Sequence, residues 1–270
     1  MKSIEPYKTV LSENNAYWMA RIAKAVYSKE PGSDKPDKDK IMADLKMEDA
    51  GFRDAIGVSK NSAQAALIEH EDYFCIAFRG TDEIKDWFDN VNAFQERALF
   101  GGFHRGFWNS LNDVWAPLYD KYLKLRSKKK RPLFLTGHSL GGAMATVAAA
   151  KLIHEDKPFT SVYTFGQPRA VTLETSRVFN VEAAGRYFRF QNNNDLVTRV
   201  PARLMGYSHV GSFLYISEEK TIHKDPGFWF RFLDAVDGAV ESATIKGIDG
   251  IEDHNMDHYL GAIAEWRSDF

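Results

Sequence analysis

The sequence predicts an α/β fold, in which a mostly parallel sheet is covered by helices on both faces. Short apolar runs alternate with longer runs of helical periodicity, as in chains whose parallel strands are connected by helices. The 270 residues suffice for one large domain, and neither an internal repeat nor a long linker divides the chain. We therefore expect a single domain over residues 1–270.

Each predicted element rests on its own pattern. A first helix carries apolar residues on one face from Tyr17 to Tyr27, and the charged, proline-containing stretch Lys29 to Lys40 predicts a surface loop after it. Apolar runs predict strands at residues 65–68, 73–78, 133–136, 161–165 and 186–190. Apolar periodicity or a high alanine content predicts helices at residues 107–125, 140–153 and 174–184.

The composition limits the class of protein. A formal net charge of −2 gives no reason to expect a polyanionic partner such as nucleic acid. The single cysteine, Cys75, lies in an apolar run, where a small buried residue is expected, and it excludes an intramolecular disulfide. No run approaches the roughly 20 apolar residues of a membrane span, and no signal-peptide pattern follows the N-terminus. We expect a soluble protein, either cytoplasmic or secreted without a recognisable N-terminal signal peptide.

The strongest functional signal is the run Gly-His-Ser-Leu-Gly-Gly at residues 137–142, between a predicted strand and a predicted helix. Gly-x-Ser-x-Gly in this setting is the signature of a nucleophile elbow, in which the serine sits on a strained turn. Side chains at Gly137 and Gly141 would collide with neighbouring backbone. A helix N-terminus under the serine would also stabilise a developing oxyanion. The pattern predicts that Ser139 is the nucleophile of a serine hydrolase.

A serine nucleophile requires a histidine base and an orienting acid, which follow in the order Ser, Asp or Glu, His in this kind of fold. Asp195 is the best-placed carboxylate, because a polar turn carries it from the strand predicted at residues 186–190. An Asx-turn residue is the alternative interpretation. His254 and His258 both lie near the head of a terminal helix, and periodicity does not separate them. His209 lies in a predicted strand, where we expect it to pack.

Several segments together resemble the class 3 lipases, the fungal-lipase-like branch of the α/β-hydrolases. They keep the family's order and cover about residues 73–260. Besides the elbow, they are Phe78-Arg79-Gly80-Thr81, Phe-His-Arg-Gly-Phe at 103–107, Phe-Gly-Gln-Pro-Arg at 165–169, residues 195–201, residues 208–216 and Asp253-His254-Asn255-Met256.

The resemblance implies the α/β-hydrolase fold and a triad of Ser139, Asp195 and His254, with His254 favoured over His258. It also implies an oxyanion hole made by Thr81 and the backbone N–H of Leu140. The implied activity is that of a lipase hydrolysing acylglycerol esters, at an oil–water or membrane interface, with neither metal nor organic cofactor. The alternatives on the same scaffold are a phospholipase A1 and a short-chain or feruloyl-type esterase. A non-catalytic lipase-like binding module is an alternative from another class.

Two further segments bear on substrate binding. Apolar residues after Thr81 recur at helical spacing, which fits either a helix packed permanently on the core or a mobile lid. The resemblance favours a lid at residues 82–100. Its apolar residues include Trp87, Phe88, Val91 and Phe94. The aromatic run 228–233, for which core packing is the favoured interpretation, lies in a helical insertion predicted at residues 223–250. This insertion is longer than the fungal pattern, so we expect a bacterial-type member of the family.

Overall fold

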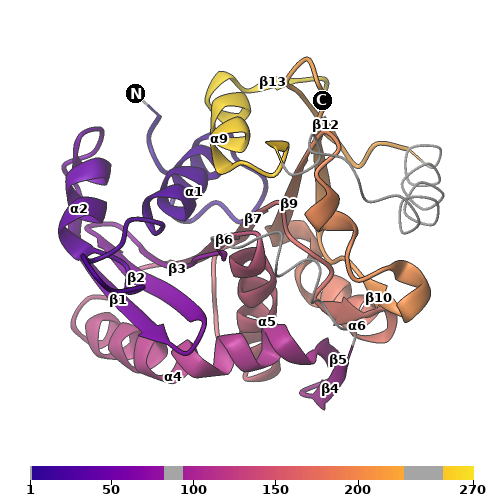
Figure 1. Cartoon of the computed structure of the whole chain (residues 1–270). Coiled ribbons are helices and arrows are strands. Elements are labelled where there is room, and N and C mark those ends of the chain that lie inside the picture. The colour runs from indigo at the N-terminus through magenta and orange to yellow at the C-terminus, as the bar shows by residue number, and fades with distance from the viewer. Residues whose placement is uncertain (1, 82–93, 228–251) are drawn as a thin grey trace.

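The computed structural model describes residues 2–81, 94–227 and 252–270, and within these ranges a large sheet lies between two layers of helices (Figure 1). From one edge of this sheet to the other, the strands are β1 (Phe52–Lys60), β2 (Ala63–His70), β3 (Phe74–Phe78), β6 (Leu133–His138), β7 (Val162–Phe165), β9 (Tyr187–Asn192), β11 (Ser212–Ile216), β12 (Thr221–Lys224) and β13 (Arg267–Ser268). Neighbouring strands from β3 to β11 run parallel, whereas β1 and β2 form an antiparallel extension beside β3. The predicted α/β fold with a mostly parallel sheet is confirmed.

Helices cover both faces of the sheet, as the alternation of strands and helices predicts. One layer contains α4 (Arg105–Lys128), α5 (Leu140–His154) and α6 (Leu173–Ala183). The other contains α1 (Glu13–Ala25), α2 (Lys38–Lys46) and α9 (Met256–Glu265). Figure 1 shows α1 and α9 side by side on one side of the sheet and α4 and α5 on the other.

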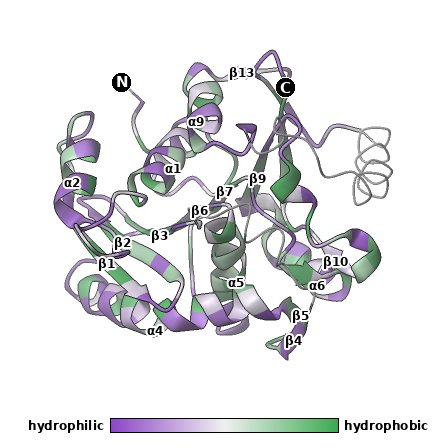
Figure 2. Ribbon diagram, in the orientation of Figure 1, coloured by the Kyte–Doolittle hydropathy of each residue, from purple (hydrophilic) through white to green (hydrophobic). Residues whose placement is uncertain are grey.

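Alternate side chains of the central strands enter two separate apolar cores. In β6, Leu133 and Leu135 pack with α4, α5 and α6, whereas Phe134 between them packs with α1, α2 and α9. Both faces of the strand are therefore buried, which explains why β6 reads as a continuous apolar run. Figure 2 shows α5 largely free of hydrophilic residues, whereas α4 alternates hydrophilic and apolar residues along its length.

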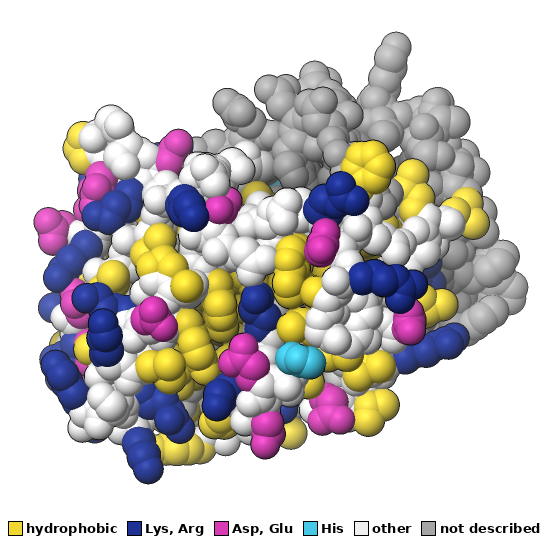
Figure 3. Space-filling model, turned by 90° about the horizontal axis from the view of Figure 1, so that it is seen from below, with side chains coloured by type: hydrophobic (Ala, Val, Ile, Leu, Met, Phe, Trp, Pro, Cys, Tyr) yellow, Lys and Arg dark blue, Asp and Glu magenta, His cyan; other side chains and the backbone are white. Residues whose placement is uncertain are grey.

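The surface agrees with the near-neutral composition. On the face seen in Figure 3, Lys and Arg side chains are interspersed with Asp and Glu and with hydrophobic side chains, and neither sign of charge dominates the described part. Among the described helices, none combines the length and the apolar character that a membrane span needs.

Two expectations for the N-terminal region are corrected. The stretch Lys29 to Lys40 is not loop throughout, because α2 begins at Lys38. The Asp37 side chain accepts hydrogen bonds from the N–H groups of Asp39 and Lys40 at 3.0 and 3.1 Å, and so caps this helix. Strand β1 was not predicted, and its partly exposed, charge-containing sequence explains why.

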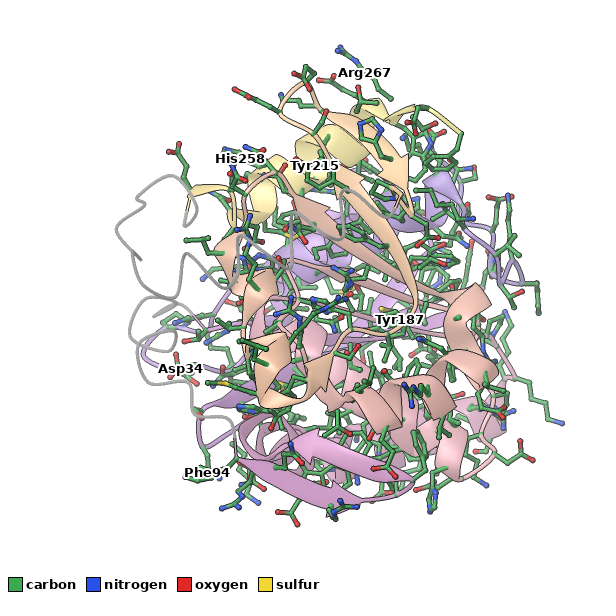
Figure 4. The ribbon with its side chains drawn as sticks, turned by 90° about the vertical axis from the view of Figure 1, so that its right-hand side faces the viewer. Asp34, Phe94, Tyr187, Tyr215, His258 and Arg267 are labelled. Atoms are coloured by element: carbon green, nitrogen blue, oxygen red, sulfur yellow. The ribbon has the colours of Figure 1, made fainter. Side chains whose placement is uncertain are left out.

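The segment predicted as a lid, residues 82–100, is only partly described. Residues 95–98 form strand β4 (Gln95–Ala98), which pairs antiparallel with β5 (Gly101–His104), so the helical pattern does not extend through the segment. The Phe94 carbonyl accepts from Arg105 N–H at 2.8 Å and from Tyr207 O–H at 3.2 Å, which holds this residue beside the small sheet (Figure 4). That sheet is completed by β8 (Val171–Thr172) and β10 (Tyr207–Ser208). Trp87, Phe88, Val91 and the aromatic run 228–233 lie outside the described residues.

Cys75 provides a test of the core. It is fully buried in β3, and burial raises the pKa of its thiol well above the ordinary value. Because the thiolate is the reactive form, we expect Ellman's reagent to leave the folded protein unlabelled in mildly alkaline buffer and to label one thiol per chain after denaturation. Rapid stoichiometric labelling of the folded protein would contradict this packing.

Candidate active site

Ser139 lies on the turn between β6 and α5, where its backbone adopts φ 58° and ψ −131°. A positive φ is strained for a residue with a Cβ, at a cost of about 1–3 kcal/mol, so the surrounding packing has to hold this turn in place. The Ser139 N–H donates to the Phe165 carbonyl of β7 at 2.9 Å, which ties the turn to the adjacent strand. The geometry is that of a nucleophile elbow.

The two glycines of the elbow allow β3, β6 and α5 to converge at Ser139. A Cβ on Gly137 would lie 2.3 Å from the Gly141 carbonyl oxygen, and one on Gly141 would lie 2.0 Å from the Phe78 carbonyl oxygen. Neither position has room for a side chain. Leu140 is the first residue of α5, so its N–H has no acceptor within the helix and is available to an oxyanion.

Asp195 and His254 form a buried hydrogen-bonded pair. Asp195 follows β9 and precedes the 3-10 turn η2 (Leu196–Arg199); both it and His254 have an exposed fraction of 0%. The Asp195 Oδ2 accepts from His254 Nδ1 at 2.8 Å and from the Tyr259 hydroxyl at 2.5 Å, while its Oδ1 accepts from Val197 N–H at 2.9 Å. These three donors compensate the carboxylate for its lost water.

The hydrogen bond to Asp195 determines which nitrogen of His254 can act as a base. A carboxylate only accepts, so Nδ1 of the neutral ring carries the proton and Nε2 keeps its lone pair. Within the described residues, neither His254 Nε2 nor Ser139 Oγ has a hydrogen-bond partner, although both atoms are buried. A hydroxyl and an acceptor nitrogen are thus both available for chemistry.

Gly166 is the point at which the three residues meet. Its neighbour Phe165 receives the hydrogen bond from Ser139 N–H. A Cβ on Gly166, which has φ 57°, would lie 2.7 Å from Asp195 Oδ2 and 2.8 Å from His254 Nδ1. The residue has to be glycine because the imidazole and the carboxylate occupy this space. The sequence indicates Gly166 through its place at the end of a strand and within the run Phe-Gly-Gln-Pro-Arg at 165–169.

Thr81 follows a glycine, Gly80, that lies beside the nucleophile Ser139. A Cβ on the preceding Gly80 would lie 2.9 Å from Ser139 Cβ, so the chain passes directly over the elbow at this point. Gly80, which follows β3, therefore lies against Ser139, and Leu140 follows Ser139 as the first residue of α5.

The other two histidines considered from sequence lie elsewhere. His258 is exposed on α9, on the outer side of the molecule in Figure 4. His254 precedes that helix and is fully buried. His209 follows β10 and bonds through Nε2 to the Thr198 carbonyl at 2.8 Å, so it packs against the turn after Asp195.

A polar clamp joins the segments of the acid and the base. The Asp253 carboxylate accepts from the Asn193 side chain and from Asn194 N–H, both at 3.1 Å. The Asp253 carbonyl accepts from the Asn192 side chain at 2.9 Å. Burial raises the pKa of the Asp253 carboxyl. Sequence reasoning did not find this clamp, although the run of asparagines before Asp195 is its signal.

Comparisons with known proteins find similarity to lipases. Residues 75–205 match the model of a protein family described as Lipase (class 3). A secreted mono- and diacylglycerol lipase 1 of Fusarium solani is 32% identical over 182 residues, which cover 64% of this chain and 51% of that protein. A lipase of Rhizomucor miehei is 29% identical over 168 residues, which cover 58% of this chain and 45% of that protein. The chain thus spans about half the length of these relatives.

Solved structures of lipases share the fold. MDLA of Penicillium cyclopium, in a mutant form, superposes with a TM-score of 0.68 over 92% of this chain and 94% of that chain, at 20% identity. The lipase of Rhizopus microsporus var. chinensis superposes with a TM-score of 0.66 over 77% of each chain, also at 20% identity. All four relatives named are fungal, so they give no support to the expectation of a bacterial-type member.

Tyr259→Phe tests the support of the acid. Burial and the charge of Asp195 raise the pKa of Tyr259 well above its ordinary value, so the hydroxyl stays protonated and donates. The same hydroxyl accepts from Asn192 N–H at 2.9 Å. We expect its removal to lower the free energy of unfolding, measured by urea denaturation, by about 1–3 kcal/mol. The control Tyr7→Phe, whose side chain is 80% exposed, should change it by less than about 0.5 kcal/mol. Equal stability of both variants would contradict the role of the hydroxyl.

Proposed function

We propose that this chain is a serine carboxylester hydrolase that acts on acylglycerol esters through an acyl-enzyme. The observation that carries the proposal is the buried Asp195–His254 pair, which leaves His254 Nε2 without a partner among the described residues, next to the elbow that holds Ser139. A hydroxyl on a strained turn, an available imidazole nitrogen and a buried carboxylate are the parts of a Ser-His-Asp mechanism.

In this mechanism His254 Nε2 takes the Ser139 proton while Oγ attacks the ester carbonyl. His254 then returns this proton to the leaving oxygen, and the tetrahedral intermediate collapses to the acyl-enzyme and a free alcohol. Water then repeats the sequence on the acyl-enzyme and releases the carboxylic acid. Asp195 remains ionised, holds the Nδ1–H tautomer and stabilises the imidazolium. The cycle needs no cofactor, because every proton transfer uses His254.

The negative charge of the intermediate falls on the former carbonyl oxygen. We assign its donors to the N–H groups of Thr81 and Leu140, with the Thr81 hydroxyl as a further donor. The position of Leu140 at the N-terminus of α5 supports the assignment, because the helix dipole there favours negative charge. One such donor typically contributes about 3 kcal/mol of transition-state stabilisation.

The names of the relatives support acylglycerols as the substrate class, since that of Fusarium solani is called a mono- and diacylglycerol lipase. The same relative is named as a secreted protein, and we therefore favour export over a cytoplasmic location for this chain.

Ser139→Ala tests the mechanism. We expect the variant to lose p-nitrophenyl ester hydrolysis by about a thousandfold or more, because no nucleophile remains. His254→Ala should be comparably inactive, whereas His258→Ala, at an exposed position, should retain the wild-type rate within about twofold. Matching thermal unfolding curves would establish that all three variants fold. Wild-type activity in Ser139→Ala would refute the proposal, and loss of activity in His258→Ala alone would reassign the base.

The choice of substrate has a separate test. Rates with p-nitrophenyl esters of increasing chain length, compared with rates on emulsified diacylglycerol, distinguish the alternatives on this scaffold. We expect hydrolysis of medium-chain or long-chain acylglycerols. Activity confined to acetate and butyrate esters would indicate a short-chain esterase, and a preference for phosphatidylcholine over diacylglycerol would indicate a phospholipase A1.

A further inference from the structure

A second histidine contacts His254 without belonging to the triad. His138 precedes Ser139 and is buried, and its Nε2 lies 2.7 Å from the backbone carbonyl oxygen of His254. The two imidazole rings lie with their centroids 4.4 Å apart. On its other side, His138 Nδ1 lies 2.7 Å from the hydroxyl of Tyr27. A chain of hydrogen bonds therefore runs from Tyr27 through His138 to the backbone of His254.

The direction of each hydrogen bond in this chain follows from its ends. A carbonyl oxygen only accepts, so the Nε2 of His138 must carry a proton and donate it to the His254 carbonyl. Burial lowers the pKa of His138 well below its ordinary value, and the nearby His254 lowers it further, so the ring is neutral. In the neutral ring Nδ1 is then an acceptor, and the Tyr27 hydroxyl donates to it.

Tyr27 also borders the segment that carries Thr81. A Cβ on Gly80 would lie 2.3 Å from the Tyr27 hydroxyl oxygen and 2.9 Å from the His138 carbonyl oxygen. The hydroxyl thus lies where the end of β3, the elbow and the base come together. Tyr27 follows α1 and is outside residues 75–205, the segment that matches the lipase family.

We propose that Tyr27 and His138 are positioning residues, which together fix the backbone of His254 and so align its imidazole with Ser139. The inference rests on the proposed serine hydrolase function. Asp195 fixes the tautomer and rotation of the ring through Nδ1, but a ring also moves with its own backbone, which the His138 donor holds. Because His138 is neutral, it adds no positive charge beside the imidazolium that forms on His254 during each transfer.

The alternative is that His138 only fills space. The two roles differ in the rate per folded active site, since a space-filling residue affects stability and a positioning residue affects kcat. Small displacements of a catalytic group lower the rate strongly while substrate binding changes little.

The experiment compares His138→Leu, His138→Gln and Tyr27→Phe with the wild type on p-nitrophenyl butyrate. Rates are normalised to active sites titrated to completion with a p-nitrophenyl phosphonate, so unfolded protein does not count. We expect kcat to fall at least about tenfold in His138→Leu and by a smaller factor in Tyr27→Phe, with KM within about twofold of wild type. Glutamine keeps a side-chain N–H that can reach the His254 carbonyl, so His138→Gln should recover much of the lost kcat.

Matched controls remove the same groups away from the site. Tyr17→Phe deletes a hydroxyl on α1 that bonds to Glu48 at 2.6 Å, and His70→Leu deletes a histidine that is 2% exposed and bonds to Asp49 at 3.2 Å. Both should retain the wild-type kcat per titrated site, whatever they do to stability.

The outcomes distinguish the positioning role of His138 from the proposed function. If His138→Leu matches the wild-type kcat per titrated site, or if His138→Gln recovers nothing over His138→Leu, the positioning role is wrong. The proposed function survives either result as long as Ser139→Ala is inactive. Activity retained by Ser139→Ala would remove the proposed function itself.

Discussion

The close approach of three backbone segments at Ser139 is the constraint on which the rest of the site depends. Gly137 and Gly141 leave no space for side chains, so β3, β6 and α5 meet with their main chains in contact. This contact holds the serine in a backbone conformation that costs free energy by itself. It also fixes the first N–H groups of α5 relative to the end of β3. A looser turn would lose both the orientation of the hydroxyl and the donors beside it.

The remaining groups are brought to this turn by segments that are far apart in the sequence. The sheet places Asp195 after β9, and the Asp253 clamp brings His254 from the head of α9 to the same edge. A single oxygen of Asp195 then binds both His254 and Tyr259. Asp195 is thereby held by two residues of one chain segment, His254 and Tyr259. This arrangement explains why a fully buried carboxylate can be tolerated in the interior.

The sequence predicts those features that are local. The strand, elbow and helix around Ser139 follow from a run of apolar residues, a glycine pattern and an alanine-rich stretch, and Asp195 follows from its polar turn. The choice between His254 and His258 does not follow from local periodicity, because both lie near one helix end. The resemblance favours His254, and in the structure its hydrogen bond to Asp195 distinguishes it. The role of Tyr27 could not be predicted from the sequence, because its hydroxyl bonds to His138, 111 residues away. In the sequence its ring resembles part of an ordinary apolar helix face. Strand β1 was not found because partly exposed strands lack a continuous apolar run.

The hydrogen bonds of His138 join parts of the chain that are synthesised at very different times. Tyr27 is made early and the elbow later, and His254 comes 116 residues after His138. During translation the nucleophile and the acid therefore leave the ribosome well before the base. Until His254 has been made and α9 has docked beside α1, Ser139 has no base. Chemistry at Ser139 would thus begin only when both layers of helices are complete.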